Sequence, residues 1–225
     1  MKTKRYLLAI LTSLLLAVGC IVGDELTTLT VHPDGSADLV MFRSNLHSSK
    51  SGQDGERELA EYKASFESRG QEDMARIRDA GGTVVMASWT RNEPPFSNVV
   101  RARFPDAAAF EKFGTSRNDD GSLQITTKWQ SDGRRRGILV RIITRPDGID
   151  LSGLSVASVE KLRQRLASGI SETRIAVAGG QITSASGFTV AEDRQSALLD
   201  ANEIAKLLKS GGGKAELHLD WEVSE

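Results

Sequence analysis

Cys20 is the only cysteine of the chain, so its thiol can be modified but has no partner for a disulfide within the chain. It ends a segment with a basic start over residues 2–5 and an apolar run over 6–18. Small residues directly precede the thiol. These three features are typical of a secretory signal peptide, and the run is shorter than the roughly 20 residues of a transmembrane helix. The thiol therefore lies where such a peptide is cleaved.

The residues Ala17-Val18-Gly19-Cys20 resemble the lipobox of bacterial lipoproteins, with Ala17 in place of the usual leucine. The resemblance implies that the Cys20 sulfur receives a diacylglyceryl group, that cleavage precedes Cys20, and that the new amine is acylated. Because each buried methylene contributes about 0.8 kcal/mol, two or more acyl chains would hold the chain at a membrane. An ordinary cleaved signal peptide with an incidental cysteine is the alternative interpretation.

These features divide the chain into a signal peptide over 1–19, a lipidated N-terminus with a short tether over 20–24, and an exported domain over 25–225. The residue after the cysteine is Ile21 and not aspartate. In the sorting pattern of enterobacterial lipoproteins this favours the outer over the inner membrane. We therefore expect a lipid-anchored protein of the bacterial cell envelope.

The charge of the mature chain excludes some partners. Residues 1–19 hold three of the 29 Lys and Arg, which leaves 26 against 30 Asp and Glu and a net charge of −4. Nucleic-acid binding requires a basic domain, so no nucleic-acid partner is expected. The membrane is expected as a partner through the lipid, together with an envelope protein or lipid of unknown identity.

Arg134, Arg135 and Arg136 form the one basic cluster of the mature chain. They lie in a predicted hairpin tip, where a solvated position is the simplest interpretation. Arginine also pairs with phosphate in a bidentate geometry, so these three residues are a candidate contact for an anion or an acidic partner. Trp129 lies next to this loop and would extend the surface if it were exposed.

Three short motifs resemble those of penicillin-binding enzymes. They are Ser158-Val159-Glu160-Lys161, Lys209-Ser210-Gly211 and Ser131-Asp132-Gly133. That chemistry needs a serine one helical turn from a lysine and a basic motif on an edge strand. Here Ser131 precedes Ser158, and Lys209 ends a predicted helix. We therefore predict no catalytic residues from these motifs.

No metal or cofactor site is predicted. His32, His47 and His218 lie far apart in the sequence, and none has a second ligand at helical spacing. Phosphate-binding, dinucleotide-binding and zinc-protease motifs are absent from the sequence.

The elements that would position these residues alternate between strand pairs and helices. The residues His32-Pro33-Asp34-Gly35 predict a tight turn between two strands. Helices are predicted over 56–80, with a weak point or kink at Gly70, and over 105–114, 155–169 and 202–209. Strands are predicted over 26–31, 37–42, 83–89, 98–104, 123–130, 137–143, 173–178, 181–184, 187–190, 195–199 and 214–223.

This order predicts an α+β fold of antiparallel sheets built from hairpins, with helices packed on one face. We expect one domain over 25–225, and a division into two parts would fall near 147–153. The first hairpin, the strand-to-helix step at Phe104-Pro105-Asp106 and the C-terminal strand–helix–strand resemble exported lipoprotein domains of the LppM type. That resemblance implies an α+β domain without catalytic motifs.

Two functions follow from these patterns. The first is a non-enzymatic domain that binds or scaffolds a partner at the membrane. The second is an envelope enzyme or a lipid or ligand carrier, whose site would be assembled from residues scattered along the sequence.

Overall fold

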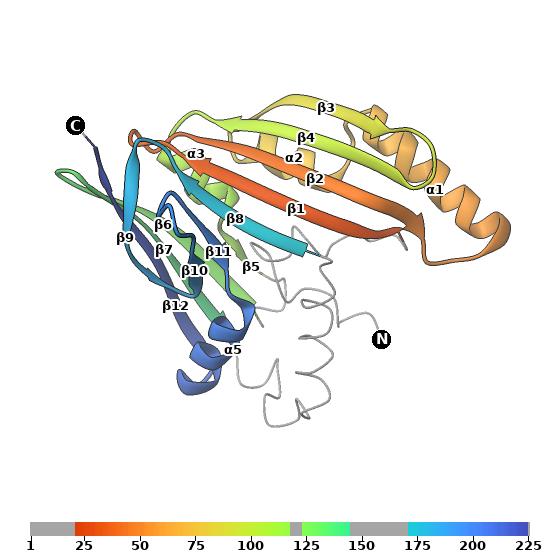
Figure 1. Cartoon of the computed structure of the whole chain (residues 1–225). Helices are drawn as coiled ribbons and strands as arrows, with labels where there is room; N and C mark the ends of the chain where they lie inside the picture. Colours follow the sequence, from red (N-terminus) through yellow and green to blue (C-terminus); the bar gives the residue numbers. More distant parts are fainter. Residues whose placement is uncertain (1–20, 118–122, 145–170, 225) are drawn as a thin grey trace.

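The strands form two sheets in the computed structural model, which describes residues 21–117, 123–144 and 171–224 (Figure 1). The larger sheet has seven strands in the order β10-β11-β8-β1-β2-β4-β3, and the smaller has five in the order β5-β6-β7-β12-β9. Their bounds are β1 Ile21–Val31, β2 Ala37–Ser48, β3 Thr83–Arg91, β4 Phe96–Phe104, β5 Ser116–Arg117, β6 Leu123–Asp132, β7 Arg135–Thr144, β8 Ser171–Val177, β9 Gly180–Ser186, β10 Phe188–Val190, β11 Ser196–Leu199 and β12 Lys214–Val223.

The β1–β2 hairpin confirms the predicted turn at residues 32–35. Leu29 pairs with Leu39 and Val31 with Ala37 in an antiparallel register. The turn works because Gly35 adopts a φ of 86°, which a residue with a Cβ rarely tolerates. Both strands extend beyond their predicted ends, and β1 begins at Ile21. Residues 21–24, expected to form a tether, therefore belong to the larger sheet.

The single helix predicted over 56–80 is two helices, α1 (Gly52–Glu67) and α2 (Glu72–Asp79). The break is stronger than a kink, because Arg69 has a positive φ of 55° and Gly70 follows it. Positive φ is incompatible with a right-handed helix. Two further helices are described, α3 (Ala107–Phe113) and α5 (Ala201–Ser210).

The larger sheet is mixed, which corrects the prediction of purely antiparallel sheets. Strand β8 runs parallel to β1, with Glu25 opposite Ser171 and Val31 opposite Val177. A parallel pair needs a crossover between distant segments, and local hairpin signals do not reveal one. The helix predicted over 155–169 and the boundary near 147–153 lie outside the described residues.

The expectation that helices cover one face also needs correction, because the described helices contact strands of both sheets. Helix α1 contacts β2, α2 contacts β3, α3 contacts β4 and β6, and α5 contacts β12. The class is broadly α+β. Within the described residues, no helix combines the length and the apolar character needed to cross a bilayer.

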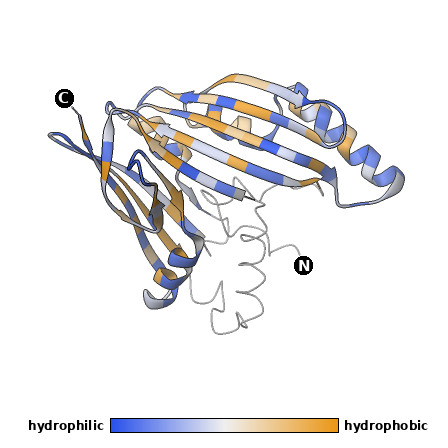
Figure 2. Cartoon of the chain, in the orientation of Figure 1, coloured by the Kyte–Doolittle hydropathy of each residue, from blue (hydrophilic) through white to orange (hydrophobic). Residues whose placement is uncertain are grey.

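One main core cluster joins residues of both sheets and of the helices. It includes Met41 of the larger sheet, Leu219 of the smaller sheet and Met74 of α2, all almost fully buried. Hydrophilic and hydrophobic residues alternate along the strands (Figure 2), as half-buried strands require. A second, smaller cluster of Ile21, Leu46 and Phe96 lies apart from the first, with α1 packed against it through Leu59 and Tyr62.

Candidate functional site

The predicted lipidation residue, Cys20, lies outside the described residues, as do Ser158 and Lys161. The residue that follows Cys20 is part of the folded body. Ile21 is 7% exposed and belongs to the smaller core cluster, and its main chain is paired with Ser48 of β2. A modification on Cys20 would thus be attached within one residue of a buried strand.

The three arginines at 134–136 lie at the tip of the β6–β7 hairpin. Arg134 and Arg135 are exposed, and Arg135 lies 3.7 Å from the carboxylate of Glu222. Arg136 differs, because its Nε donates to the carbonyl oxygen of Pro33 at 2.7 Å and a terminal nitrogen donates to that of Gly133 at 2.6 Å. The expected solvated position therefore does not extend to Arg136, which connects the smaller sheet to the β1–β2 turn.

A groove of about 690 Å³ lies beside this hairpin on the smaller sheet. Gly137 lies in it, and a Cβ there would come within 2.6 Å of Asp220 Oδ1 and 3.2 Å of Gln130 Oε1. The side-chain oxygens of Asp220 and Gln130, both hydrogen-bond acceptors, therefore lie next to Gly137. Asp132, Glu222 and Arg135 also line the groove. Because carboxylates and arginines both line the groove, it carries charges of both signs. The sequence had predicted a contact for an anion or an acidic partner from the arginines alone.

A second groove of about 610 Å³ lies at the β1–β2 turn and includes His32, Asp34 and Arg103. Beside it, His32 Nε2 is 2.9 Å from Asp38 Oδ2, and Arg103 Nε donates to Asp38 Oδ1 at 2.9 Å. The hydrogen bond from Arg103 lowers the pKa of Asp38, burial opposes that effect, and His32 adds to it. The bond from Arg136 to Pro33 joins this groove to the first one.

In this second groove, the hydroxyl group of Ser36 is held by a hydrogen bond to a carboxylate. Ser36 Oγ donates to Asp34 Oδ1 at 2.7 Å, and this bond, together with the Ser36 backbone amide, lowers the pKa of Asp34. The Ser36 hydroxyl is thus committed to a carboxylate and not to the His32 imidazole. A histidine held by a carboxylate can accept a proton or a hydrogen bond, so His32 could orient a polar ligand.

The remaining predicted residues are not brought together. His47 contacts the carbonyl oxygen of Asn45, and His218 contacts Ser184 Oγ at 3.1 Å. Within 21–117, 123–144 and 171–224, no group of His, Cys, Asp and Glu could hold a metal ion. Lys209 lies in the last turn of α5, one residue before the helix ends, and Ser131 lies beside the β6–β7 tip.

The tryptophans belong to the core or pack against it. Trp221 is fully buried, and Trp129 packs edge-on against it with ring centroids 5.4 Å apart. Trp89 packs against Phe66 of α1 at 4.9 Å. Trp129 therefore does not extend the arginine surface.

Sequence reasoning missed a polar row that crosses the inner face of the larger sheet. Glu25 pairs with Arg43, Arg43 with Asn98, and Asn98 with Trp89, so four strands each contribute one side chain. The signal was present in the sequence. Residues 37, 39, 41 and 43 of β2 share one face, and only Arg43 breaks the apolar series.

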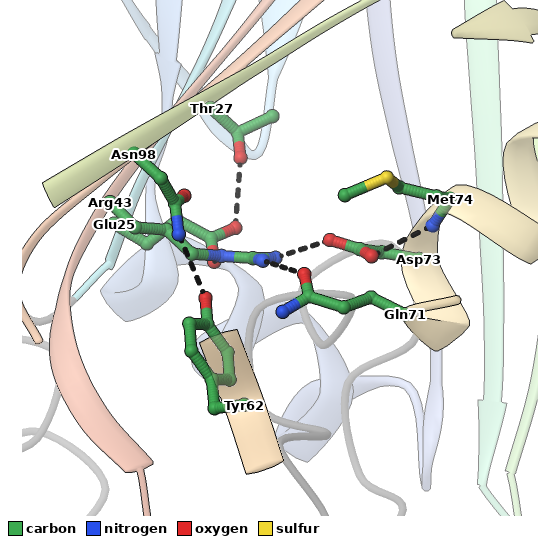
Figure 3. A network of polar contacts seen from close by, with 8 residues as sticks. All are labelled: Glu25, Thr27, Arg43, Tyr62, Gln71, Asp73, Met74 and Asn98. Atoms are coloured by element: carbon green, nitrogen blue, oxygen red, sulfur yellow. Dashed lines mark hydrogen bonds and ion pairs between the residues drawn. The ribbon is translucent and has the colours of Figure 1, made fainter. Parts of the chain in front are cut away.

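Arg43 is the centre of this row (Figure 3). Its guanidinium donates to Glu25 Oε2 and to Asp73 Oδ2, both at 2.7 Å, and the three side chains are 13%, 9% and 9% exposed. Burial lowers the pKa of Arg43, but the charges of Asp73 and Glu25 outweigh burial and raise it above the ordinary value. Arg43 therefore stays charged and holds α2 against β1 and β2.

Asn98 completes the row toward α1. Its side-chain nitrogen donates to Tyr62 Oη at 3.0 Å. Asn98 is fully buried, and its Oδ1 has no hydrogen-bond partner among the described residues. The row lies between the two core clusters, and its side chains bond to Asp73 of α2 and Tyr62 of α1. We therefore interpret it as a structural connection between these helices and the sheet.

Comparisons with known proteins give little further information on what this site does. No protein family matches the sequence, and no curated protein is significantly similar to it. The folded domain of Mycobacterium tuberculosis LppM, solved by NMR, aligns over 92% of both chains with 9% identity and a TM-score of 0.38. The Mu homology domain of Fcho1 from Danio rerio, solved with an Eps15 peptide, covers 92% of this chain and 80% of its own, with 8% identity and a TM-score of 0.21. At these TM-scores, no property of either protein follows for this chain.

Proposed function

We propose that this chain is a lipoprotein of the bacterial cell envelope, anchored through acyl chains on Cys20, whose folded body binds or scaffolds a partner without catalysis. In a bacterium with two membranes, the outer membrane is the favoured location. The observation that carries the proposal is the position of Ile21. The lipobox-like sequence ends at Cys20, and the next residue is already buried in β1.

The burial of Ile21 supports an anchor that leaves the folded body little freedom to move relative to the membrane. With Ile21 packed against Leu46 and Phe96, acyl chains on Cys20 would hold the start of β1 at the membrane surface. Strand β1 has 11 residues, so its other end lies about 33 Å away at 3.3 Å per residue. The two polar grooves adjoin that far end, where an envelope partner could reach them.

Binding is supported by the character of the grooves. Both are open and carry charges of both signs, and Arg136 joins them. A surface of this kind suits a polar partner that offers donors and acceptors together. We infer that the partner contacts the groove of the smaller sheet that Arg135 lines.

An envelope enzyme or carrier is the second candidate, and the His32–Asp38 pair is the observation that favours it. A histidine oriented by a carboxylate is the usual arrangement of a general base. For an enzyme, His32→Gln would abolish turnover of an envelope substrate and leave partner capture unchanged. For a binding domain, capture would weaken.

Replacing Cys20 by serine tests the anchor. We expect Cys20→Ser to appear in the soluble fraction or as an uncleaved precursor, whereas the parent chain stays with the membranes. Mass spectrometry of the parent N-terminus should show a cysteine that carries acyl groups. A processed, membrane-bound Cys20→Ser protein, or an unmodified N-terminus at another residue, would disprove the proposal.

Capture of partners from intact envelopes, with the anchor retained, tests binding. Arg135→Glu reverses a charge in the groove, and Arg141→Glu makes the same change on the exposed surface of the same strand, at an arginine that pairs with Glu216. We expect only Arg135→Glu to weaken capture. Equal capture by both variants would exclude the groove as the contact.

A further inference from the structure

We propose that the outer face of the seven-stranded sheet, the face turned away from α1 and α2, lies on the bilayer that holds the anchor. This inference rests on the proposed function. It adds an orientation, which a lipid on Cys20 does not by itself determine. The occupant of the face would be the lipid headgroup region, not a protein.

Strand alternation defines the outer face. Leu29, Leu39 and Val100 point inward and are buried in the main core. The residues between them point outward, because successive side chains of a strand alternate. One outward row runs from Leu26 through Phe42 and Val99 to Ser88, and the next from Thr28 through Val40 and Arg101 to Met86. The middle of this face is therefore mainly apolar, with Arg101 as its one charged residue in these two rows.

Two exposed apolar residues of this face lie close to the anchor, and a third, Val85, lies on the edge strand β3. Ile21 packs inward, so Val22 points outward, and Val22 and Leu26 are 42% and 39% exposed. On the outer face these two side chains lie on either side of Asp24. Both residues lie within six positions of Cys20 on one strand, so an anchored chain would hold them next to the bilayer.

Charge distinguishes the two sides of the sheet. On the inner side, α1 carries five carboxylates against Arg57 and Lys63, a net charge of −3. An anionic bilayer would repel this side. On the outer face, Asp38 and Glu172 are neutralised by Arg103 and Arg174, and Asp24 accepts a hydrogen bond from Asn45.

Arg101 adds to this contrast, because it is exposed and has no ion-pair partner in the described part of the chain. The outer face thus has Arg101 available for lipid phosphate, together with Arg91 of β3, which is also exposed and lies opposite Ser97. The carboxylate of Asp24, bonded by a neutral amide, keeps its charge. The helical side has an excess of carboxylates. With the start of β1 fixed at the membrane, the chain would settle with its outer face toward the lipid.

A single introduced thiol can report this orientation, because the Cys20 sulfur would be held in a thioether. We would label Leu26→Cys on the outer face and, as a matched control, Glu61→Cys on the exposed side of α1 with the same fluorophore. Each lipidated full-length protein would be reconstituted in vesicles of phosphatidylethanolamine and phosphatidylglycerol that contain a headgroup-level nitroxide lipid. Thr28→Cys, the next outward position, serves if Leu26→Cys does not fold.

We expect the nitroxide to quench the label at position 26 several-fold more than the label at position 61. Equal quenching, or stronger quenching at position 61, in protein that floats with the vesicles would overturn the orientation and leave the anchor intact. Disulfide cross-linking between two unlabelled Leu26→Cys chains, with weak quenching of the labelled protein, would also overturn it by assigning the face to a second copy. Protein that neither carries acyl groups nor floats would refute the proposed function and this inference together.

Discussion

Arg43 of β2 donates to Asp73 of α2 over 2.7 Å, and both side chains are almost completely removed from solvent. The pair joins a strand to a helix 30 residues further along the chain. Because the same guanidinium also binds Glu25, one cation is the partner of two buried carboxylates. Removing Arg43 would leave both carboxylates without this partner, which costs more than removing one member of a surface ion pair.

Arg43→Met should lower the free energy of unfolding by about 3–5 kcal/mol, the usual loss when a buried charge loses its partner. Chemical denaturation followed by circular dichroism measures this loss. Arg141→Met is the control, because its pair with Glu216 is more than half exposed and should contribute less than about 1 kcal/mol. Similar losses for both variants would show that the row is not the connection described above.

Arg136→Met should destabilise the protein more than Arg135→Met, although both arginines lie in one cluster. Arg136 satisfies the carbonyl oxygens of Pro33 and Gly133, and hydrogen bonds to a charged donor contribute about 1.5–3 kcal/mol. Arg135 only approaches Glu222 at 3.7 Å on the surface. Thermal unfolding of the two variants tests this difference, and equal midpoints would contradict the role of Arg136 as a link between the sheets.

Acid should destabilise the protein partly through Asp200, the N-cap of α5. Its carboxylate accepts from the backbone amides of Glu203 and Asn202 and from Thr189, and the bond from Glu203 contributes most to lowering its pKa. A carboxyl whose pKa is lower in the folded than in the unfolded state contributes its full stability above about pH 5. That contribution is lost as the pH falls through the folded-state value.

Asp200→Asn should therefore change stability little at pH 7, since asparagine caps equally well, and should weaken the loss of stability below pH 5. Asp200→Ala should cost about 1 kcal/mol at pH 7 because the cap is removed. Melting temperatures between pH 7 and pH 2.5 measure both effects. Glu192→Gln, at an exposed position in the turn after β10, is the control and should follow the parent curve.

Gly187→Ala should be more damaging than Gly133→Ala, although both glycines have positive φ, of 80° and 56°. Each substitution carries the backbone penalty of roughly 1–2 kcal/mol. At position 187 the new Cβ would also lie 2.6 Å from Leu217 Cδ2 in the core, whereas at position 133 nothing lies within 4 Å. Overpacking adds about 1–3 kcal/mol, so denaturation midpoints should differ clearly, and equal midpoints would contradict the packing around Leu217.

Local signals predicted most elements of the fold. Gly35 in the first turn, Gly81 and Gly82 after α2, and Asp106 before α3 each determine a chain reversal or a helix end through their own backbone chemistry. Asp106 accepts from the backbone amide of Ala109, as an N-cap does. Such features depend on neighbours in sequence, and the sequence pattern identifies them.

Features that depend on distant segments could not be predicted in this way. The parallel pairing of β8 with β1 joins residues about 146 positions apart, such as Glu25 and Ser171, and no local pattern encodes it. Arg136 was expected to be solvated because its partner, Pro33, lies 103 residues away. Arg43 carried a sequence signal, since a charge interrupts an apolar face, but Asp73 could be identified as its partner only from the packing of α2.

The contact between Tyr62 of α1 and Asn98 of β4 provides a final test, through a double-mutant cycle. Tyr62→Phe removes the hydroxyl that accepts from Asn98 Nδ2. Asn98 is fully buried and its Oδ1 already lacks a partner among the described residues, so the loss should be about 1–3 kcal/mol.

Asn98→Leu alone should leave the Tyr62 hydroxyl without its donor. The combination of Tyr62→Phe and Asn98→Leu replaces both polar groups by apolar ones of similar size, and should therefore be more stable than the sum of the single losses predicts. Urea denaturation of the four proteins gives the coupling energy, and strictly additive losses would show that the two side chains do not interact.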